Sequence, residues 1–580
     1  MQYRNLYLFQ ITAMDDKTTD FHKSSYFLPY TIALLWSYAK TIPDISKNYQ
    51  LQKLFWKPES EQTILNQIKS PDVIGFSNYL WNTETHSKLA FQIKKKYPEC
   101  LIVFGGPNIP LDSYWLKDRP YIDLIVHQEG EITFSNILAQ RLVSNNYTDV
   151  DGISINGSEV IKTPSATRIK NINEIPSPYL TGLFDDIVEN NPDTLFQATF
   201  ETARGCPFKC TFCDWGGYTH QKMQKFDMDK IKEEVDWLSK NKIHALWFAD
   251  SNTGIFKGRD LEIFKYISDN RNLFEFPKMI FVTGFSKTPP EKNDTLQIQK
   301  ILTETGLPIH PRIAVQSFND DTLKHIKRDN LNIYNIKDLN THQKDNDIKA
   351  EIELIFPLPG TTYKSFVKDY EYMLSFENAV PMIYCCLLLP RSEMATPSYR
   401  KNHGLIGTQM PFNSKGEKCE IVTSTNDITQ EEVTKCWMLS WVIYTFWYSS
   451  VCVKLFKKLS LMYDMKIIDI CLLIQNFIET DNSNLSFQYN DMKNKMHSDY
   501  KYYNIRDIVG ENISCHLFND KNEHLNKTEL VELLIRFVSK EFNQSTFLSK
   551  ILIDETLHKS SKKRSSKKYN PMKQSINATI

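Results

Sequence analysis

Short apolar runs alternate with helical periods from Tyr3 to about Arg141, and this alternation limits the possible folds more than any other feature. Strands separated by helices cannot pair through tight turns, so they form a parallel sheet covered by helices. We therefore predict a doubly wound α/β domain over residues 1–150. Its expected strands are Leu6–Thr12, Gln50–Trp56, Val73–Ser77, Leu101–Phe104 and Leu124–Val126. Its expected helices lie near Pro29–Lys40, Glu61–Ile68, Thr83–Lys96 and Glu131–Leu142.

The loops after these strands form the expected binding edge, because ligands of doubly wound sheets bind beyond the carboxyl ends of the strands. Glycine is scarce, with 19 in 580 residues, so a pair of adjacent glycines in one of these loops is informative. Glycine lets the backbone approach a bulky ligand closely. The candidate binding residues of the loops are Ser77, Asn78, Gly105, Gly106, Glu129 and Gly130.

The same alternation returns between Leu195 and about Leu389 and predicts a second α/β domain over residues 193–400. Six strands separated by helices favour a partial parallel barrel, a TIM-like (β/α)6 fold, with its chemistry at the carboxyl ends of the strands. The expected strands are Leu195–Thr202, Ala245–Ala249, Met279–Thr283, Arg312–Gln316, Glu351–Phe356 and Met382–Leu388. Residues 151–192 are predicted to be a linker, with a hairpin at Gly152–Lys162 and a proline-stiffened segment.

The alternation fades beyond Pro397, and residues 401–555 are predicted to be mainly helical, with aromatic-rich helices at Gln430–Met462 and Ile467–Ile478. Cys436–Val453 carries no charge for 18 residues, near the lower length limit for a membrane span. Serine and threonine interrupt it and aromatic residues fill its middle, so we expect a buried or partner-facing helix. Residues 556–580 include the basic, serine-rich run Lys559–Lys568 and are expected to be disordered.

Charge and cysteine content narrow the functional classes. The 69 basic and 69 acidic residues cancel, so no overall basic field favours nucleic acid as a partner. The first residues show no basic region followed by a small-residue cleavage site, so we expect no export signal. Eleven cysteines, three of them within eight residues, fit a reducing compartment and a metal centre better than disulfides. A cytoplasmic protein is expected.

Three cysteines directly after the first strand of the second domain carry the most specific signal. Cys206, Cys210 and Cys213 have the spacing C-x-x-x-C-x-x-C. Three thiolates on one loop can bind three irons of a four-iron, four-sulfur cluster and leave the fourth iron without a protein ligand. Zinc is the alternative, because thiolates suit it and His220 could supply a fourth ligand. Structural zinc sites, however, normally use two separated pairs of ligands.

This motif resembles that of the radical S-adenosylmethionine superfamily, C-x-x-x-C-x-aromatic-C, with Phe212 as the aromatic residue. The resemblance implies a 4Fe-4S cluster on the three cysteines, whose open iron is chelated by the amino and carboxylate groups of S-adenosylmethionine. An electron from a donor such as flavodoxin or ferredoxin would cleave S-adenosylmethionine to methionine and a 5'-deoxyadenosyl radical. That radical takes a hydrogen atom from an unreactive carbon, while the protein supplies orientation.

Later segments are similar to family signatures and follow in the same order. The end of the second barrel strand stands where the family contacts the methionine amino group, although the usual Gly-Gly-Glu is absent. The fourth strand resembles the signature near the ribose and carboxylate, and Ile352–Thr362 resembles the segment that packs on the adenine. Each segment could also be ordinary cap or turn chemistry. The resemblance implies S-adenosylmethionine contacts from Phe212, Asp250, Asn252, Gln316, Ser317, Arg328 and Ile355.

The order of the domains looks like that of the cobalamin-binding class of radical S-adenosylmethionine enzymes. This resemblance covers residues 1 to about 400, makes the first domain Rossmann-like and of the cobalamin-binding type, and implies that its loops surround the corrin. The chain departs from the mutase pattern D-x-H-x-x-G, since His22 follows the first strand without the glycine. Members of the class include proteins without that histidine and proteins without cobalamin, so the cofactor itself stays open.

The resemblance implies a cobalamin-dependent methyltransferase acting on an unactivated carbon or a phosphorus centre of a small, natural-product-like substrate. A radical cyclase or rearrangement enzyme, and a non-catalytic iron-sulfur module, remain alternatives. Cys385 and Cys386 are adjacent on a predicted strand and point to opposite faces, so we expect packing residues, and Tyr384 or Cys386 could relay a hydrogen atom. The cysteines expected in apolar helix cores are Cys436, Cys452 and Cys471.

Overall fold

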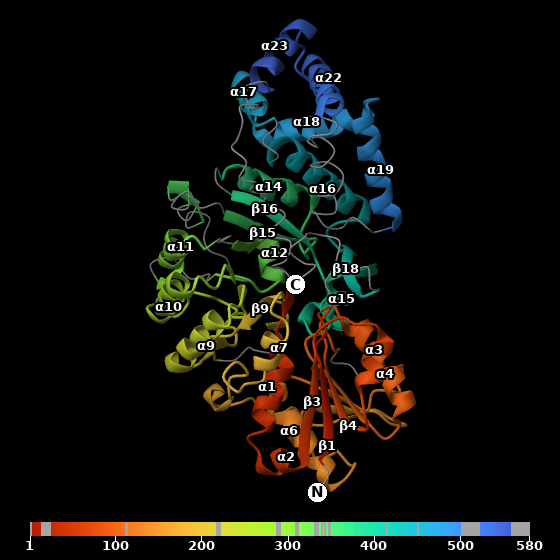
Figure 1. The fold of residues 1–580 in the computed structure, drawn as a ribbon. Coiled ribbons are helices and arrows are strands. Elements are labelled where there is room, and N and C mark those ends of the chain that lie inside the picture. The colour runs from red at the N-terminus through yellow and green to blue at the C-terminus, as the bar shows by residue number, and fades with distance from the viewer. Residues whose placement is uncertain are drawn as a thin grey trace.

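The computed structural model describes residues 3–12, 25–110, 114–215, 222–282, 284–285, 292–307, 312–329, 336–337, 340–341, 344–345, 350–376, 379–412, 416–448, 452–499 and 523–557. Three parts follow one another along the long axis of the molecule: a first sheet with its helices, a second group of strands, and a helical end (Figure 1). The α/β fold class predicted from the sequence is confirmed.

The first sheet has seven strands in the order β3-β1-β4-β5-β6-β7-β8. The first five of these pair in parallel, and β7 and β8 add antiparallel strands from the predicted linker. In chain order the parallel strands read 2-1-3-4-5, the flavodoxin-like order, whose crevice lies where β1 and β4 end. The strands are β1 (Arg4–Phe9), β3 (Tyr49–Phe55), β4 (Pro71–Ser77), β5 (Leu101–Gly105), β6 (Leu124–Val126), β7 (Ile153–Ile155) and β8 (Ile161–Lys162).

Helices cover both faces of this sheet. Because side chains alternate along a strand, Leu6 and Leu8 pack into one layer while Tyr7 and Phe9 pack into the other. The first layer holds α1 (Tyr30–Ala39), α2 (Pro43–Asn48) and α6 (Gly130–Val143). The second layer holds α3 (Glu61–Gln67), α4 (Thr83–Lys96) and α5 (Tyr114–Lys117).

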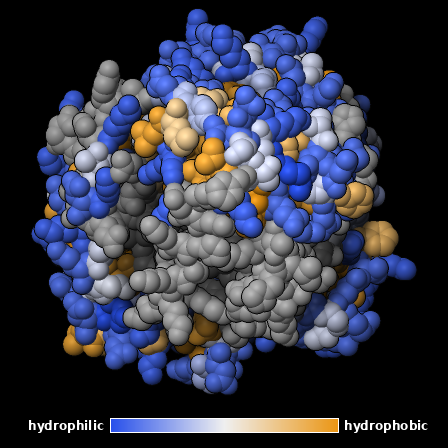
Figure 2. Space-filling view, turned by 90° about the horizontal axis from the view of Figure 1, so that it is seen from above, coloured by the Kyte–Doolittle hydropathy of each residue, from blue (hydrophilic) through white to orange (hydrophobic). Residues whose placement is uncertain are grey.

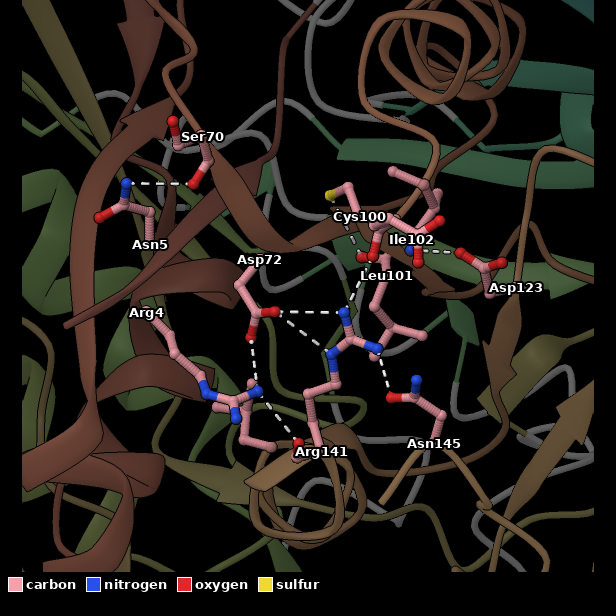
Figure 3. Close-up of polar contacts among 12 residues, drawn as sticks. Arg4, Asn5, Ser70, Asp72, Cys100, Leu101, Ile102, Asp123, Arg141 and Asn145 are labelled. Atoms are coloured by element: carbon pink, nitrogen blue, oxygen red, sulfur yellow. Dashed lines mark hydrogen bonds and ion pairs between the residues drawn. The ribbon is translucent and has the colours of Figure 1, made fainter. Parts of the chain in front are cut away.

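Ion pairs hold the amino-terminal edge of the first sheet (Figure 3). Asp72, near the start of β4, accepts from Arg4 Nη1 at 3.4 Å and from Arg141 Nη2 at 3.1 Å. Lys94 Nζ lies 2.8 Å from Asp123 Oδ2, which also accepts from the Ile102 N–H. These contacts join strands to the helices beside them at the edge opposite the predicted binding loops.

The second group of strands contains all six predicted barrel strands, with bounds shifted by a few residues. All their pairings are parallel, within the two sheets β13-β12-β9-β2 and β14-β15-β16. The strands are β9 (Leu195–Phe200), β12 (Ala245–Phe248), β13 (Met279–Val282), β14 (Arg312–Gln316), β15 (Ala350–Phe356) and β16 (Ala379–Cys385). The helices between them are α9 (Met228–Lys240), α10 (Arg259–Phe274), α11 (Thr295–Glu304), α12 (Asp320–His325) and α14 (Tyr363–Leu374).

One strand of this second group comes from the amino-terminal part of the chain. β2 (Ser25–Phe27) pairs in parallel with β9, with Ser25 opposite Leu195 and Phe27 opposite Gln197. The side chain of Gln197 also donates to Ser25 Oγ at 2.7 Å. β2 was not expected from the sequence, because three residues are too short to show a strand period. The amino-terminal part therefore contributes to the edge of the barrel sheet.

The carboxyl-terminal part is mainly helical and contains a hairpin of β17 (Ile406–Pro411) and β18 (Lys418–Ser424). The prediction of one helix over Gln430–Met462 was wrong. α16 (Gln430–Ile443) continues into the π-helical turn η4 (Tyr444–Tyr448), and α17 (Val453–Tyr463) then runs at 100° to them. The other helices are α15 (Pro397–His403), α18 (Ile467–Thr480), α19 (Asn484–Asp499), α22 (Glu523–Glu541) and α23 (Thr546–Leu557).

The aromatic residues of α16 are core residues, as expected. Trp437 and Trp441 are fully buried, so these rings fill the interior between the helices and the barrel. In the described parts of the chain, no single helix is long and apolar enough to cross a membrane; the bent pair α16–η4 and α17 would pass by length and composition alone. The helical end carries apolar side chains among polar ones on its surface (Figure 2).

Candidate functional site

The three motif cysteines lie on a loop that leaves the carboxyl end of β9 through the short strand β10 (Ala203–Arg204). Cys206 and Cys210 are buried, and Cys213 is half-buried. Backbone hydrogen bonds fix the loop to the far side of the barrel: the Thr211 N–H donates to Ile326 O at 3.1 Å, and the Met394 N–H donates to Thr211 O at 2.8 Å. The motif therefore sits at the end of the barrel where the sequence predicted the chemistry.

Two residues predicted to contact S-adenosylmethionine donate to cysteine sulfurs. Asn252 Nδ2 lies 3.6 Å from Cys206 Sγ, and Arg328 Nη1 lies 3.8 Å from Cys210 Sγ. Burial lowers the pKa of Arg328, while the Cys210 thiol opposes that shift. Arginine stays charged at any ordinary pH, so a cation faces one of the three sulfurs.

The three sulfurs do not form a compact single-ion site. Within the described ranges, no three His, Cys, Asp or Glu side chains lie close enough to hold one metal ion. A single zinc ion needs ligands that converge to about 2.0–2.3 Å from one point. A four-iron cluster takes each thiolate on a different iron, so its ligands need not converge in this way. His220, the alternative fourth ligand, lies outside the described residues.

Asp250 braces the base of the cysteine loop. Its carboxylate accepts from the N–H groups of Thr202 at 2.8 Å and Ala203 at 3.0 Å, and from the Thr202 hydroxyl. Burial raises the pKa of Asp250 to about 7, and these hydrogen bonds oppose the shift. These three hydrogen bonds tie the carboxylate to the segment that leads into the cysteine loop.

Two amide oxygens beside the loop have no hydrogen-bond partner. Asn252 Oδ1 and Gln316 Oε1 are both buried and unsatisfied. Gln316 has a left-handed backbone, with φ of 69°, where the register of β14 shifts against β15. Buried acceptors without donors are costly, so the N–H groups of an amino group, such as that of a methionine moiety, fit this part of the site. Ser317, by contrast, donates to Asp369 Oδ2 at 3.0 Å.

The apolar residues predicted to contact S-adenosylmethionine also lie near the loop. Phe212 and Ile355 are half-buried and pack against one cluster of buried residues at this end of the barrel. Cys386 belongs to the same cluster, with its Sγ 3.5 Å from Met394 Sδ. Tyr384, on β16, donates to Glu353 Oε1 at 3.4 Å. Cys436, Cys452 and Cys471 are buried among the helices, as expected.

The first two predicted binding loops of the first sheet pack against each other. The Asn78 N–H and its side-chain amide both donate to Gly105 O, at 2.8 and 3.1 Å. Gly106 has φ of 105°, and a Cβ there would lie 2.4 Å from Asn78 O. The glycine is thus required by the approach of the neighbouring loop, a reason internal to the protein. Ser77 is buried beside Asn78, and His22 lies outside the described residues.

The third loop is tied to the cysteine loop. Arg204, two residues before Cys206, donates to Glu131 Oε1 at 2.9 Å and to Glu201 Oε1 at 2.9 Å. Its Nη1 also lies 3.6 Å from Glu129 Oε1, and Glu129 accepts from the Ile169 N–H at 3.1 Å. Gly130 begins α6 between these carboxylates. Glu129, a predicted binding residue, and Glu131 are therefore both paired with Arg204, a residue with no predicted role.

Arg391 forms a second connection between the two parts. It follows β16, is buried, and donates to Gly106 O at 3.0 Å. Burial lowers its pKa to about 10, while Asp214, next to Cys213, opposes that shift. Burial in turn raises the pKa of Asp214 to about 6. No local pattern marks Arg391, because its contact joins residues 285 positions apart.

The family model described as "Radical SAM superfamily" matches residues 200–373, which begin at the end of β9 and include all three cysteines. These residues form a radical SAM domain.

Two curated relatives extend the likeness beyond the radical SAM domain. The chain is 32% identical to the 2-(S-pantetheinyl)-carbapenam-3-carboxylate methyltransferase of Streptantibioticus cattleyicolor, over 71% of this chain and 62% of the relative. It is also 32% identical to the cobalamin-dependent radical SAM methyltransferase TokK of Streptomyces tokunonensis, over 65% of this chain and 56% of TokK. The chain thus spans less than two thirds of the length of either relative.

A solved structure shares the fold around the radical SAM domain as well. The cobalamin-dependent S-adenosylmethionine radical enzyme OxsB, with aqua-cobalamin and S-adenosylmethionine bound, matches with a TM-score of 0.56. The match covers 97% of this chain and 82% of OxsB at 15% sequence identity. The fold of OxsB therefore includes counterparts of the first sheet and the helical end as well as the radical SAM domain.

Proposed function

We propose that this chain is a cobalamin-dependent radical S-adenosylmethionine methyltransferase acting on an unactivated carbon or a phosphorus centre of a small molecule. The observation that carries the proposal is the meeting of two loop systems. Arg204 links the cysteine loop to the Glu129–Glu131 loop, and Arg391 links the segment after β16 to Gly106. The loops that would hold the two cofactors are therefore in direct contact with each other.

The cysteine loop supplies ligands for the iron-sulfur cluster. Cys206, Cys210 and Cys213 would hold three irons, and the open iron would receive the amino acid part of S-adenosylmethionine. When bound, the cluster supplies the electron that cleaves S-adenosylmethionine to methionine and a 5'-deoxyadenosyl radical. The unpaired oxygens of Asn252 and Gln316 would accept hydrogen bonds from the methionine amino group, and the apolar side chains Phe212 and Ile355 would orient the adenosine.

The first sheet would hold cobalamin, which supplies methyl transfer when bound. The flavodoxin-like strand order leaves its crevice beside Ser77 and Asn78, and the contact with Gly106 keeps the neighbouring loop close to them. Support comes from relatives: TokK is named a cobalamin-dependent methyltransferase, and OxsB contains aqua-cobalamin. Flavodoxin or ferredoxin would supply electrons, and a three-thiolate cluster suits a reducing cytoplasm.

A labelling experiment tests methyl transfer. The anaerobically reconstituted protein, loaded with cobalamin and reduced with dithionite, is incubated with S-adenosylmethionine labelled in its methyl group. A carbapenam carboxylate is the first substrate to test, because one relative is named for that class. Label in the product together with 5'-deoxyadenosine supports the proposal. Product without label would instead indicate a cyclase or rearrangement enzyme, and an intact cluster that yields no 5'-deoxyadenosine would indicate a non-catalytic module.

A further inference from the structure

A buried arginine contacts one of the three motif thiols. Arg328 is 6% exposed, and its Nη1 lies 3.8 Å from Cys210 Sγ. The resemblance to the superfamily implied that this residue binds S-adenosylmethionine. Its contact with a cysteine sulfur points to a different role, on the cluster itself.

Several contacts hold the Arg328 side chain in this place. The residue follows α12, and its N–H donates to Leu323 O at 3.0 Å. Its second terminal nitrogen, Nη2, donates to Ala314 O on β14. One end of the guanidinium is therefore fixed by the barrel wall while the other faces sulfur. The planar guanidinium of arginine can direct one terminal nitrogen to each of two acceptors, which a flexible lysine ammonium does less well.

The charge of Arg328 matters because of the charge on the cluster. Three thiolates give an oxidised 4Fe-4S cluster one net negative charge, and a single added electron makes two. A nearby cation stabilises the doubly negative form more than the singly negative form, and a hydrogen bond to thiolate sulfur acts in the same direction. Low solvent exposure increases both effects, because water screens them less. A buried arginine at Cys210 therefore favours the reduced cluster.

The three cysteines differ in their surroundings. Cys206 receives a neutral donor, Asn252 Nδ2, at 3.6 Å, whereas Cys210 receives a cation. Carboxylates lie farther along the barrel wall: Glu353, which also acts on Arg328 electrostatically, is 3.5 Å from Arg312 Nη1. Glu353 therefore has its own cationic partner on β14, and Arg312 balances part of its charge.

We propose that Arg328 is a positioning residue for the cluster, and that its guanidinium raises the reduction potential of the iron-sulfur centre held by Cys206, Cys210 and Cys213. This inference rests on the proposed function, because it assumes a cluster at the three cysteines. The redox step is the uptake of one electron by the oxidised cluster from an external one-electron donor. Arg328 itself gains and loses nothing, and it acts through the sulfur of Cys210.

The test compares midpoint potentials of the reconstituted full-length protein without substrate. The cluster is titrated with dithionite in the presence of redox mediators, and its reduced form is followed by electron paramagnetic resonance. Arg328→Gln removes the positive charge. Arg328→Lys keeps the charge but removes the planar guanidinium with its two terminal nitrogens. Lys327→Gln is the matched control: it removes one positive charge at the neighbouring position, where the exposed ammonium pairs with Glu393 at 2.6 Å.

We expect a more negative midpoint potential in Arg328→Gln, a smaller shift in the same direction in Arg328→Lys, and no shift in Lys327→Gln. An unchanged potential in Arg328→Gln with a full cluster would overturn the inference, as would an equal shift in the control. If Arg328→Gln binds no cluster, Arg328→Lys decides: a lower potential supports the role and an unchanged one refutes it. An unchanged potential together with weakened S-adenosylmethionine binding would overturn the inference. It would support the S-adenosylmethionine contact that the resemblance implied for Arg328. If the wild-type protein binds no cluster, the proposed function fails first.

Discussion

Replacing Gly106 with alanine tests the packing of the loops that are proposed to hold cobalamin. The new Cβ would lie 2.4 Å from Asn78 O and 2.6 Å from Asn78 N, and both are backbone atoms that cannot rotate away. The loop would have to move by about 1 Å to restore an ordinary contact. The backbone of Gly106 also has φ of 105°, a region that residues with a side chain rarely adopt.

The strained backbone and the close contact with Asn78 both lower the stability of Gly106→Ala. A side chain held in a strained backbone region costs about 1–3 kcal/mol, and overpacking of a close contact costs a further 1–3 kcal/mol or so. We therefore expect Gly106→Ala to lower the free energy of unfolding by about 2–6 kcal/mol. The displaced loop would also lose the contact between Gly106 O and Arg391, and cobalamin binding would weaken with it.

The adjacent glycine provides the control. At Gly105 a Cβ would lie 3.5 Å from Val126 Cβ, an ordinary van der Waals distance, and its backbone is not in the left-handed region. Urea unfolding followed by circular dichroism measures stability, and a spectroscopic titration with hydroxocobalamin measures binding. Gly105→Ala should stay within about 1 kcal/mol of wild type. Wild-type stability and wild-type cobalamin affinity in Gly106→Ala would refute the reasoning.

Three further substitutions have defined outcomes. Cys210→Ala should abolish the charge-transfer absorbance of the reconstituted cluster, whereas Cys100→Ala, at a buried thiol just before β5, should keep it; an intact cluster in Cys210→Ala would contradict the ligand assignment. Arg204→Met leaves the buried carboxylate of Glu131 and the half-buried carboxylate of Glu201 without this partner and should cost about 3–5 kcal/mol in urea unfolding, so a loss below about 1 kcal/mol would show that the ion pairs contribute little. The pKa of Asp250 is raised from 3.8 to about 7, so its contribution to stability is full below about pH 4 and is lost as the pH rises through 7. Relative to Asp250→Asn, wild type should lose on the order of 4 kcal/mol over that pH interval, and parallel pH profiles of unfolding would refute this.

The sequence predicted the strands well, because buried parallel strands are continuous apolar runs. β9, β12 and β14 begin at the predicted residues, and the cysteine loop follows β9 as expected. β2 and the break after α16 were missed for physical reasons. A three-residue strand has no measurable period, and a bend between two apolar helices leaves their hydrophobic pattern uninterrupted.

The composition of the site was less predictable than its position. Spacing identified the three cysteines, but it could not show that Asp250 braces their loop or that Arg328 contacts Cys210. Arg204 and Arg391 were missed altogether, since each contacts a loop of the first sheet that is distant in sequence. Such pairings depend on how the two α/β parts are docked, and local patterns contain no information on docking.

The formation of 5'-deoxyadenosine tests the central assignment most directly. The protein is reconstituted anaerobically with iron and sulfide, reduced with dithionite, and incubated with S-adenosylmethionine, and the nucleoside is quantified by mass spectrometry. We predict 5'-deoxyadenosine from the wild-type protein and none from Cys210→Ala. A wild-type protein that contains the full cluster and releases no 5'-deoxyadenosine, with or without substrate, would contradict the account.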